Sequence, residues 1–339
     1  MYPDIELVWL FQSPEEKAKV IPDYIRTVKF NSLKSFYELA TAKVWIDNFN
    51  KPSFLFKGDK QFYIQTWHGD KGIKKILYDV RTQLSDGSYL EGDLFEENHC
   101  DLAIAGSEYG ELKHYRSGFN YQGEILKEGS PRNDKLINRS DEKITAVKNK
   151  LGIESETRIL LFAPTMRESD ENARHKVEGI NLEETLDLME KETGKKWVCL
   201  IRAHSSTKSL EGLPQTDRFL NVSDFEDMSD LLLVSDILIT DYSSSAGDFA
   251  LLDRLVILFQ NDRDEYISKD RKLYFDIDES PYLVALNQEE LNGLLCNYYK
   301  LDIEKNCKDI LSFYGSYETG QASERIAEKI KTFIRSEKA

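Results

Sequence analysis

Short apolar runs alternate along this chain with longer stretches in which apolar residues recur at helical spacing. Apolar runs of four or five residues, at 159–163, 197–201, 237–240 and 255–259, are typical of buried strands. Amphipathic stretches such as 182–192 and 227–234 lie between them and indicate helices. This alternation predicts an α/β fold in which helices connect the strands of parallel sheets.

The first half of the chain shows the same alternation in shorter elements. A charged helix predicted at 141–151 separates the halves, and near it we place a domain boundary, which gives domains 1–145 and 146–339. Each half contains a helix that runs into an apolar strand, which suggests two doubly wound, Rossmann-like domains facing each other across a cleft. The first half is expected to contain strands at 7–10, 28–30, 44–47, 61–66, 102–107 and 124–126, and helices behind Ser13 and at 35–41 and 108–117.

The most informative stretch begins where the predicted strand 237–240 stops at Thr240. Asp241 follows, and Ser243 and Ser244 stand where the next helix is expected to begin. Hydroxyl groups, free amides and the positive end of the helix dipole attract anions at such a place. Ser and Asp are also ordinary helix caps, an alternative that this turn alone leaves open.

Other predicted strands also end in polar turns, and these contain the His and Arg residues that capping does not require. Trp67-His68-Gly69 follows the run at 61–66. Histidine can move a proton near neutral pH, and glycine allows close approach of a ligand, although a lone histidine is more often structural. The strand-end cations together predict a site for a diphosphate with a proton acceptor beside it, as phosphoryl transfer requires. They are His68, Arg132, Arg167, Arg202 and His204.

Composition narrows the choice of function further. The 339 residues include 45 basic and 60 acidic side chains, and the net charge of −15 argues against nucleic-acid binding. Four cysteines without metal-ligand spacing indicate buried thiols in a reducing cytosol. Neither an apolar run of about 20 residues nor a basic leader is present, so we expect a cytoplasmic protein, with peripheral attachment to the inner face of the membrane left open. The pair Asp276 and Asp278 is only a weak signal for a metal site.

At this point seven segments resemble one known family, the CDP-glycerol glycerophosphotransferases of teichoic acid and capsule synthesis. Any one segment is weak, but their common order over residues 28–283 is highly specific. The segments are Trp45-Ile46-Asp47-Asn48, Gln65-Thr66-Trp67-His68-Gly69, Gly129-Ser130-Pro131-Arg132-Asn133-Asp134, Ala163-Pro164-Thr165-Met166-Arg167, Arg202-Ala203-His204, Thr240-Asp241-Tyr242-Ser243-Ser244 and Tyr274-Phe275-Asp276.

The resemblance implies a GT-B fold and transfer of glycerol phosphate or ribitol phosphate from a CDP-activated donor to a hydroxyl of a lipid-linked glycan or growing polymer, with CMP leaving. It implies no metal and no further cofactor. His68 matches the proposed catalytic base of the family, and we expect His204 to assist at the phosphates. The residues expected to border the donor are Trp67, Gly69, Arg132, Pro164, Thr165, Arg167, Arg202, Thr240, Asp241, Ser243, Ser244 and Asp248.

Two departures from the family pattern stand out. The family usually has Thr-Pro after the His-Gly pair, where this chain has Asp70 and Lys71. The family's usual first strand and glycine-bearing turn are missing, so we expect the first sheet to lack an edge or the chain to be one part of a longer protein. The alternatives are a GT-B glycosyltransferase that uses a nucleotide sugar, and a non-catalytic partner that kept the fold.

Overall fold

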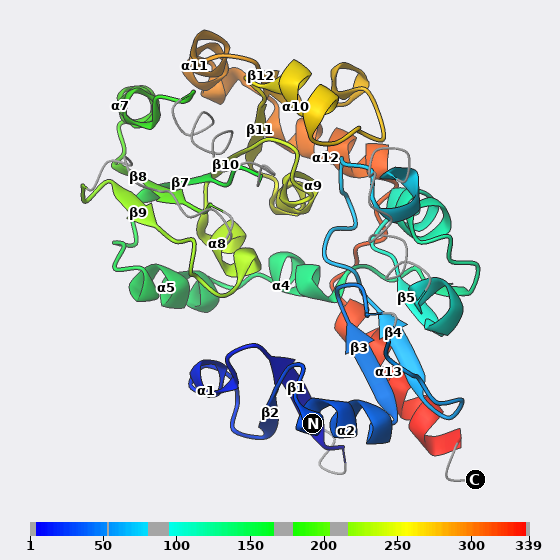
Figure 1. Ribbon diagram of the computed structural model, residues 1–339. Coiled ribbons are helices and arrows are strands. Elements are labelled where there is room, and N and C mark those ends of the chain that lie inside the picture. The colour runs from blue at the N-terminus through cyan, green and yellow to red at the C-terminus, as the bar shows by residue number, and fades with distance from the viewer. Residues whose placement is uncertain (1–4, 53, 81–94, 166–178, 204–215, 337–339) are drawn as a thin grey trace.

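The computed structural model describes residues 5–52, 54–80, 95–165, 179–203 and 216–336 (Figure 1). These residues form three sheets of two, four and six strands. Every strand pair within them is parallel, which confirms the predicted α/β class.

The six-stranded sheet has the order β12-β11-β10-β7-β8-β9. Counted from its first strand this is the doubly wound order 3-2-1-4-5-6 of a dinucleotide-binding fold, read from the opposite edge. Alternate residues of one strand enter different cores: Leu161 faces one and Leu160 the other, which explains the unbroken apolar runs. Strands β9 and β12, of three residues each, were not predicted from the sequence. The strands are β7 (Arg158–Phe162), β8 (Trp197–Ile201), β9 (Phe219–Asn221), β10 (Ile237–Thr240), β11 (Leu255–Phe259) and β12 (Leu283–Ala285).

Helices lie on both faces of this sheet (Figure 1). Several begin at a side chain that accepts a backbone N–H of the first turn, such as Asn181 before α7 and Asp227 before α8. These local caps are why the helices start where the sequence predicts. The helices are α5 (Asp141–Lys150), α7 (Leu182–Thr193), α8 (Met228–Val234), α9 (Ser245–Phe249), α10 (Arg263–Lys269), α11 (Gln288–Cys296) and α12 (Ile303–Tyr314), with 3-10 turns η4 (Ala250–Leu252), η5 (Ile277–Glu279) and η6 (Tyr298–Lys300).

The first half contains a four-stranded sheet in sequential order. Among the described strands, the first two pair with each other and with no other strand, whereas the sequence suggested one continuous alternation. Two short helices accompany them (Figure 1). The elements are β1 (Leu7–Phe11), α1 (Pro14–Lys17), β2 (Ile25–Lys29), α2 (Leu33–Thr41), β3 (Val44–Asp47), β4 (Phe62–Gln65), β5 (Leu102–Ile104) and β6 (Glu124–Leu126).

A π-helix replaces the α-helix predicted at 108–117. It is η2 (Gly110–Gly118), whose widened turn is visible in the hydrogen bond from Phe119 N to the His114 carbonyl oxygen, five residues back. A side chain at Gly110 would meet the Asp70 carboxylate at 2.0 Å, so glycine is required where this helix lies against the loop that follows β4. The neighbouring short elements are η1 (Leu77–Val80), η3 (Pro131–Asn133) and α4 (Asp134–Ile137).

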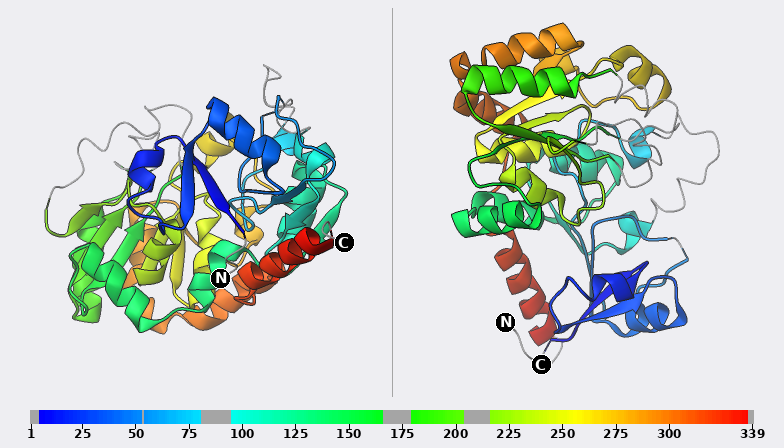
Figure 2. Two further views of the ribbon diagram at one scale, coloured as in Figure 1. Left: turned by 90° about the horizontal axis from the view of Figure 1, so that it is seen from below. Right: turned by 90° about the vertical axis from the view of Figure 1, so that its left-hand side faces the viewer.

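The end of the chain returns to the first half. Helix α13 (Ala322–Ser336) lies along β3 and β4 (Figures 1 and 2), where Ile326 joins the core of the four-stranded sheet and Phe333 stacks on Phe62 at 4.9 Å. The division between residues 145 and 146 stays a prediction, and α13 packs on the first sheet because its strongly amphipathic face finds apolar residues there. Within the described residues, no helix is both long and apolar enough to cross a membrane.

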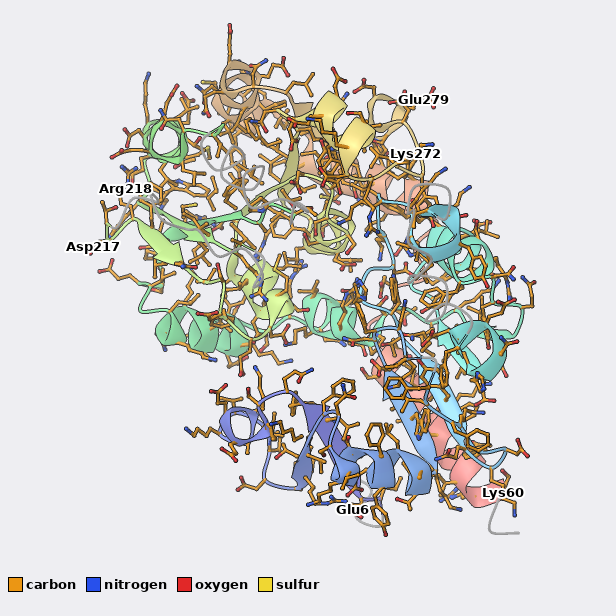
Figure 3. All side chains as sticks on the ribbon, in the orientation of Figure 1. Glu6, Lys60, Asp217, Arg218, Lys272 and Glu279 are labelled. Atoms are coloured by element: carbon orange, nitrogen blue, oxygen red, sulfur yellow. The ribbon has the colours of Figure 1, made fainter. Side chains whose placement is uncertain are left out.

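A second connection joins the halves beside η1. Lys75 N donates to the carbonyl oxygen of Lys272 at 3.0 Å, and Tyr274 N donates to that of Ile73 at 3.0 Å, so the segment before η5 pairs with the loop after β4. Lys272, which takes part in this connection, is labelled in Figure 3. The loop after β4 is therefore bordered by both halves of the chain.

Candidate functional site

The strand order of the six-stranded sheet reverses between β7 and β10, which are neighbours although the strands β8 and β9 separate them in sequence. In doubly wound sheets, ligands bind at such a switch point, beyond the carboxyl ends of the strands. Thr165 follows β7 and Asp241 follows β10. The Thr165 hydroxyl donates to Asp241 Oδ1 at 2.5 Å, and Thr165 N donates to the same carboxylate at 2.9 Å. The structure thus brings these two predicted residues together and fixes them against each other.

The serine turn after β10 differs in detail from its prediction. Thr240 is buried, and its hydroxyl donates to the Ala163 carbonyl oxygen at 2.6 Å, which leaves it a structural role. Ser243 Oγ accepts from Ser245 Oγ at 2.9 Å and from Ser245 N at 3.3 Å. Because α9 has only five residues before η4, its dipole contributes less to anion binding than a long helix would. Side-chain donors must therefore supply more of the positive charge.

Gly69 brings the two halves of the site into contact. A Cβ atom at this position would lie 2.6 Å from Ser244 Oγ, so only glycine lets the loop after β4 approach the serine turn this closely. From the sequence, Gly69 was expected to allow a sharp turn or the close approach of a ligand. The left-handed conformation is instead found at Trp67, with φ 52°, and Gly69 serves a close contact between distant segments.

His68 is held by the residues that follow β3. Its Nδ1 lies 2.9 Å from the Asn48 carbonyl oxygen, which can only accept a hydrogen bond. Nδ1 therefore carries the proton in the neutral ring, and Nε2 has a free electron pair. The Trp67 ring lies 3.9 Å from the imidazole and the Phe49 ring stacks on it at 5.5 Å. We call His68, Asn48, Phe49 and Trp67 the His68 platform.

The charge state of His68 suits a proton acceptor. Part of the His68 side chain contacts solvent, but many protein atoms lie near the ring and partly desolvate it. This desolvation lowers the pKa of His68, the bond to Asn48 opposes it, and the positive charges of Arg132 and Lys74 lower the pKa further. His68 is therefore neutral at pH 7 and able to take a proton at Nε2.

Three residues after His68, the same loop contributes Lys71 to a group of buried charges. Arg132 Nη2 donates to Asp248 Oδ2 at 2.6 Å, and Lys71 Nζ lies 3.0 Å from Glu318 Oε1 and 3.6 Å from Asp248 Oδ1. Asn133 Nδ2 donates to both carboxylates, at 2.9 and 2.7 Å. We call Lys71, Arg132, Asn133, Asp248 and Glu318 the buried charge cluster. It joins the loop after β4, η3, α9 and the segment before α13.

The electrostatics of the cluster favour its charged form. Burial lowers the pKa of Lys71, but the carboxylates of Glu318, Asp248 and Asp70 more than offset this and raise it overall. Burial raises the pKa of Asp248, and the cations Arg132 and Lys71 outweigh that effect. Asp248 was expected to contact the donor, but its side chain is 5% exposed and is occupied by Arg132, Asn133 and Lys71. It therefore orients Arg132.

The remaining predicted cations follow other strand ends. Arg202 follows β8, and its Nη1 donates to the Phe225 carbonyl oxygen at 2.6 Å. Since β8 is two strands from β10, the ends of these strands lie roughly 10 Å apart along one edge of the sheet. Pro164 precedes Thr165 at the switch point. Arg167 and His204 lie outside the described residues, so their predicted roles stay predictions.

The described residues provide few side chains that could bind a metal ion together. No group of three or more His, Cys, Asp or Glu side chains within them is placed to hold one. In the weak candidate pair, Asp276 caps η5 by accepting from Asp278 N, and Asp278 accepts from Arg263 Nη1 at 2.7 Å.

Sequence reasoning missed the residues that orient the site. Asn48 acts through its backbone carbonyl oxygen, which no side-chain pattern reveals. Lys71 was noted as a departure from a family pattern and otherwise expected on a solvated helix face, whereas it is fully buried, and Glu318 stands in a polar turn without a motif. The one available signal was the charged pair Asp70-Lys71 directly after the His-Gly turn.

Comparisons with known proteins identify a family for this chain. A family model described as "CDP-Glycerol:Poly(glycerophosphate) glycerophosphotransferase" matches residues 1–332. The chain is 30% identical to a teichoic acid poly(glycerol phosphate) polymerase of Staphylococcus epidermidis over 99% of its length, which is 47% of that relative. It is 31% identical to a teichoic acid glycerol-phosphate transferase of Staphylococcus aureus, covering 97% of this chain and 86% of the relative.

A solved structure matches at the level of the fold as well. The wall teichoic acid polymerase TagF superposes with a TM-score of 0.82 and 31% identity, over 99% of this chain and 83% of that one. The two sheets with their crossover helices are thus a GT-B-like arrangement, as expected from the sequence. The chain spans about half of the first relative and most of the other two.

Proposed function

The chain belongs to the CDP-glycerol:poly(glycerophosphate) glycerophosphotransferase family of enzymes, and we propose that it transfers glycerol phosphate from CDP-glycerol to a hydroxyl of a lipid-linked teichoic acid chain, releasing CMP. Glycerol is chosen over ribitol because the relatives at 30% and 31% identity are named for glycerol phosphate. Capsule polymers would offer the same acceptor chemistry.

The proposed reaction is one displacement at phosphorus. The acceptor oxygen attacks the phosphorus that carries glycerol, a new P–O bond forms, and the P–O bond to CMP breaks. Nε2 of His68 takes the proton of the attacking hydroxyl, and the bond to Asn48 stabilises the imidazolium that results. Arg132 and Arg202 offset negative charge on the phosphates, a contribution that in this proposal replaces a metal.

One observation carries the proposal. Gly69 lies so close to Ser244 that the residue preceding it, His68, stands beside the serine turn at the switch point of the six-stranded sheet. A proton acceptor from one half of the chain therefore borders the place where the other half is expected to hold a diphosphate. No comparable observation favours a nucleotide-sugar donor.

A donor screen tests the proposal directly. The purified chain would be incubated with a synthetic lipid-linked glycerol phosphate primer and, in separate reactions, with CDP-glycerol, CDP-ribitol or UDP-sugars. We expect CMP release and primer extension with CDP-glycerol at a rate well above that with CDP-ribitol. UDP release without CMP release would contradict the proposal and support a glycosyltransferase.

We also propose peripheral contact with the inner face of the membrane, made by the N-terminal residues. Of the 16 exposed large hydrophobic side chains among the residues that the structure describes, 11 lie between residues 7 and 56, including Leu33 at 90%, Phe54 at 66% and Phe56 at 81% exposure. Exposed aromatic residues suit the membrane interface. With a net charge of −15, attraction to anionic lipids is weak, so apolar contact must dominate.

Vesicle sedimentation tests this contact. The double variant Phe54→Ser, Phe56→Ser should bind phosphatidylglycerol-containing vesicles at least several-fold less than the unmodified chain. The variant Tyr299→Ser, at a 66% exposed position far along the chain, is the matched control and should bind unchanged. Equal binding by all three proteins would contradict the proposed surface.

A further inference from the structure

A chain of buried polar side chains connects the end of β4 to the loop that holds His68. Gln65 is 1% exposed, and its Oε1 accepts from Trp67 N at 2.9 Å, one residue before His68. Its Nε2 donates to the Phe49 carbonyl oxygen at 3.1 Å and to the Tyr63 hydroxyl oxygen at 2.9 Å. A single amide thus ties together the two aromatic residues of the platform.

Glu96 completes this chain from the opposite side. Its Oε1 accepts from the Tyr63 hydroxyl at 3.0 Å and from Lys51 N at 2.6 Å, and Lys51 ends the loop that contains Asn48. Glu96 is 1% exposed, and its Oε2 has no hydrogen-bond partner among the described residues. Burial raises the pKa of Glu96 to about 7, against the lowering effect of the bonds from Lys51 and Tyr63. A carboxylate in this place is costly, which argues that its acceptor oxygen serves a purpose.

The loop of residues 48–51, which follows Asp47 at the end of β3, has no regular structure to hold it. Asp47 Oδ1 accepts from Asn48 N and Phe49 N, and its other oxygen pairs with Lys51 Nζ. These bonds shape the loop internally. Gln65 and Glu96 anchor it to the sheet at Phe49 and Lys51, on either side of Asn50. The carbonyl oxygen of Asn48 is therefore set by the same polar chain that sets Trp67.

We propose that Glu96, Tyr63 and Gln65 are positioning residues that fix His68 in the tautomer with a free Nε2, an inference that rests on the proposed function of His68 as the base. None of the three touches the imidazole. They act through the Asn48 carbonyl oxygen, which fixes the proton on Nδ1, and through Phe49 and Trp67, which fix the ring plane. Misplacement of a reacting group by about 1 Å can reduce turnover about 100-fold.

The test combines a spectroscopic and a kinetic measurement on the full chain. Long-range 1H–15N spectra of protein labelled at its five histidines report the tautomer of each ring, and His68→Gln assigns the signal. We expect the Nδ1–H form in the unmodified protein and a mixture of tautomers in Gln65→Leu. With CDP-glycerol and the lipid-linked primer, kcat of this variant should fall 10- to 100-fold while KM for CDP-glycerol stays within twofold.

Conservative and control variants guard against loss of folding. Tyr63→Phe keeps the ring and removes only the hydroxyl, so it should shift the same signal to a smaller extent. Tyr282→Phe removes a buried hydroxyl that bonds to Tyr314 Oη, away from the platform, and is the matched control. Glu96→Gln keeps an acceptor oxygen and should retain more of the Nδ1–H form than Glu96→Leu.

The outcomes separate this inference from the function on which it rests. An unchanged His68 tautomer and unchanged kcat in both Gln65→Leu and Tyr63→Phe would overturn the inference. If His68→Ala retains full turnover, the proposed function of His68 fails instead. The tautomer measurement does not use the reaction and still decides whether the polar chain orients the ring.

Discussion

The His68 platform and the buried charge cluster share one loop, in which Lys71 follows His68 by three residues, yet their surroundings are of opposite kinds. Neutral groups surround His68: a backbone carbonyl oxygen, an indole and a phenyl ring. Full charges surround Lys71, which is completely buried between Glu318 and Asp248. No carboxylate accepts a hydrogen bond from the described His68 ring, and such a partner would raise the pKa of the histidine. Neutral contacts therefore suit a base, and paired charges suit a fixed guanidinium.

The two regions also differ in the parts of the chain that hold them in place. The platform is held within the first half, by β3, β4 and the loop after β3. The buried charge cluster draws on both halves and on the segment before α13. Loss of a platform residue should therefore alter chemistry more than stability, whereas loss of a cluster residue should alter stability throughout the molecule.

The largest effect is expected from His68→Ala, which tests whether the platform serves chemistry. Removal of a general base typically costs 100- to 10,000-fold in rate, so turnover of CDP-glycerol should fall by this amount. The affinity for CDP-glycerol, measured by calorimetry, should change by less than tenfold, or about 1.4 kcal/mol. Unchanged turnover would remove His68 from the mechanism and make the neutral platform a purely structural feature.

Lys71→Met should have the next largest effect and tests whether the cluster serves stability. It leaves the carboxylates of Glu318 and Asp248 buried without their shared cation, which typically costs about 3–5 kcal/mol of unfolding free energy. Urea unfolding followed by circular dichroism would measure it. Lys305→Met is the matched control, since that lysine forms an exposed ion pair with Asp309 one helical turn away and should change little. Equal stability of both variants would refute the contrast.

Arg202→Ala tests whether donor affinity depends on the carboxyl ends of the strands of the six-stranded sheet, outside both regions. A lost charged hydrogen-bond partner costs about 1.5–3 kcal/mol, so the Kd for CDP-glycerol should rise about 10- to 150-fold. Arg254 also bonds to backbone carbonyl oxygens, those of Leu233 and Ser235, but it precedes β11 at the opposite end of the strands. Arg254→Ala should leave the Kd unchanged. An unchanged Kd in Arg202→Ala would place donor binding elsewhere.

Some residues of these regions could be predicted from the sequence and others could not, for a physical reason. Strand ends are local signals, so His68, Arg202 and the Asp241 turn were found from apolar runs and the residues after them. The α/β class followed from the same runs. Glu318 reaches Lys71 across 247 positions, and Glu96 reaches Lys51 across 45, contacts that no local pattern encodes. The separate pairing of β1 with β2 and the return of α13 to the first sheet likewise depend on tertiary packing.

The smallest effect is expected from a fall in pH. It concerns His114, which lies against the loop that contains His68. His114 on η2 is 1% exposed, and neither ring nitrogen has a hydrogen-bond partner among the described residues. Burial lowers its pKa from 6.5 to about 3, the Gly72 backbone opposes this effect, and the positive charges of Arg132 and of a protonated His68 would lower the pKa further. Between these values the unfolded chain binds a proton that the folded chain does not. Stability should therefore fall as the pH drops below 6.5, by up to about 1.4 kcal/mol per pH unit from this group.

The variant His114→Phe isolates that contribution. Its ring needs no hydrogen bond, so the missing partners of His114 cost nothing in the variant, and any packing strain changes stability equally at every pH. Urea unfolding at pH 6.5, 6.0 and 5.5 should give a shallower dependence of unfolding free energy on pH than in the unmodified chain. An identical slope would mean that His114 is protonated in the folded protein to the same extent as in the unfolded chain at these pH values. A charge would then stand behind the loop of His68, and the platform could not be the neutral setting that the comparison with the cluster describes.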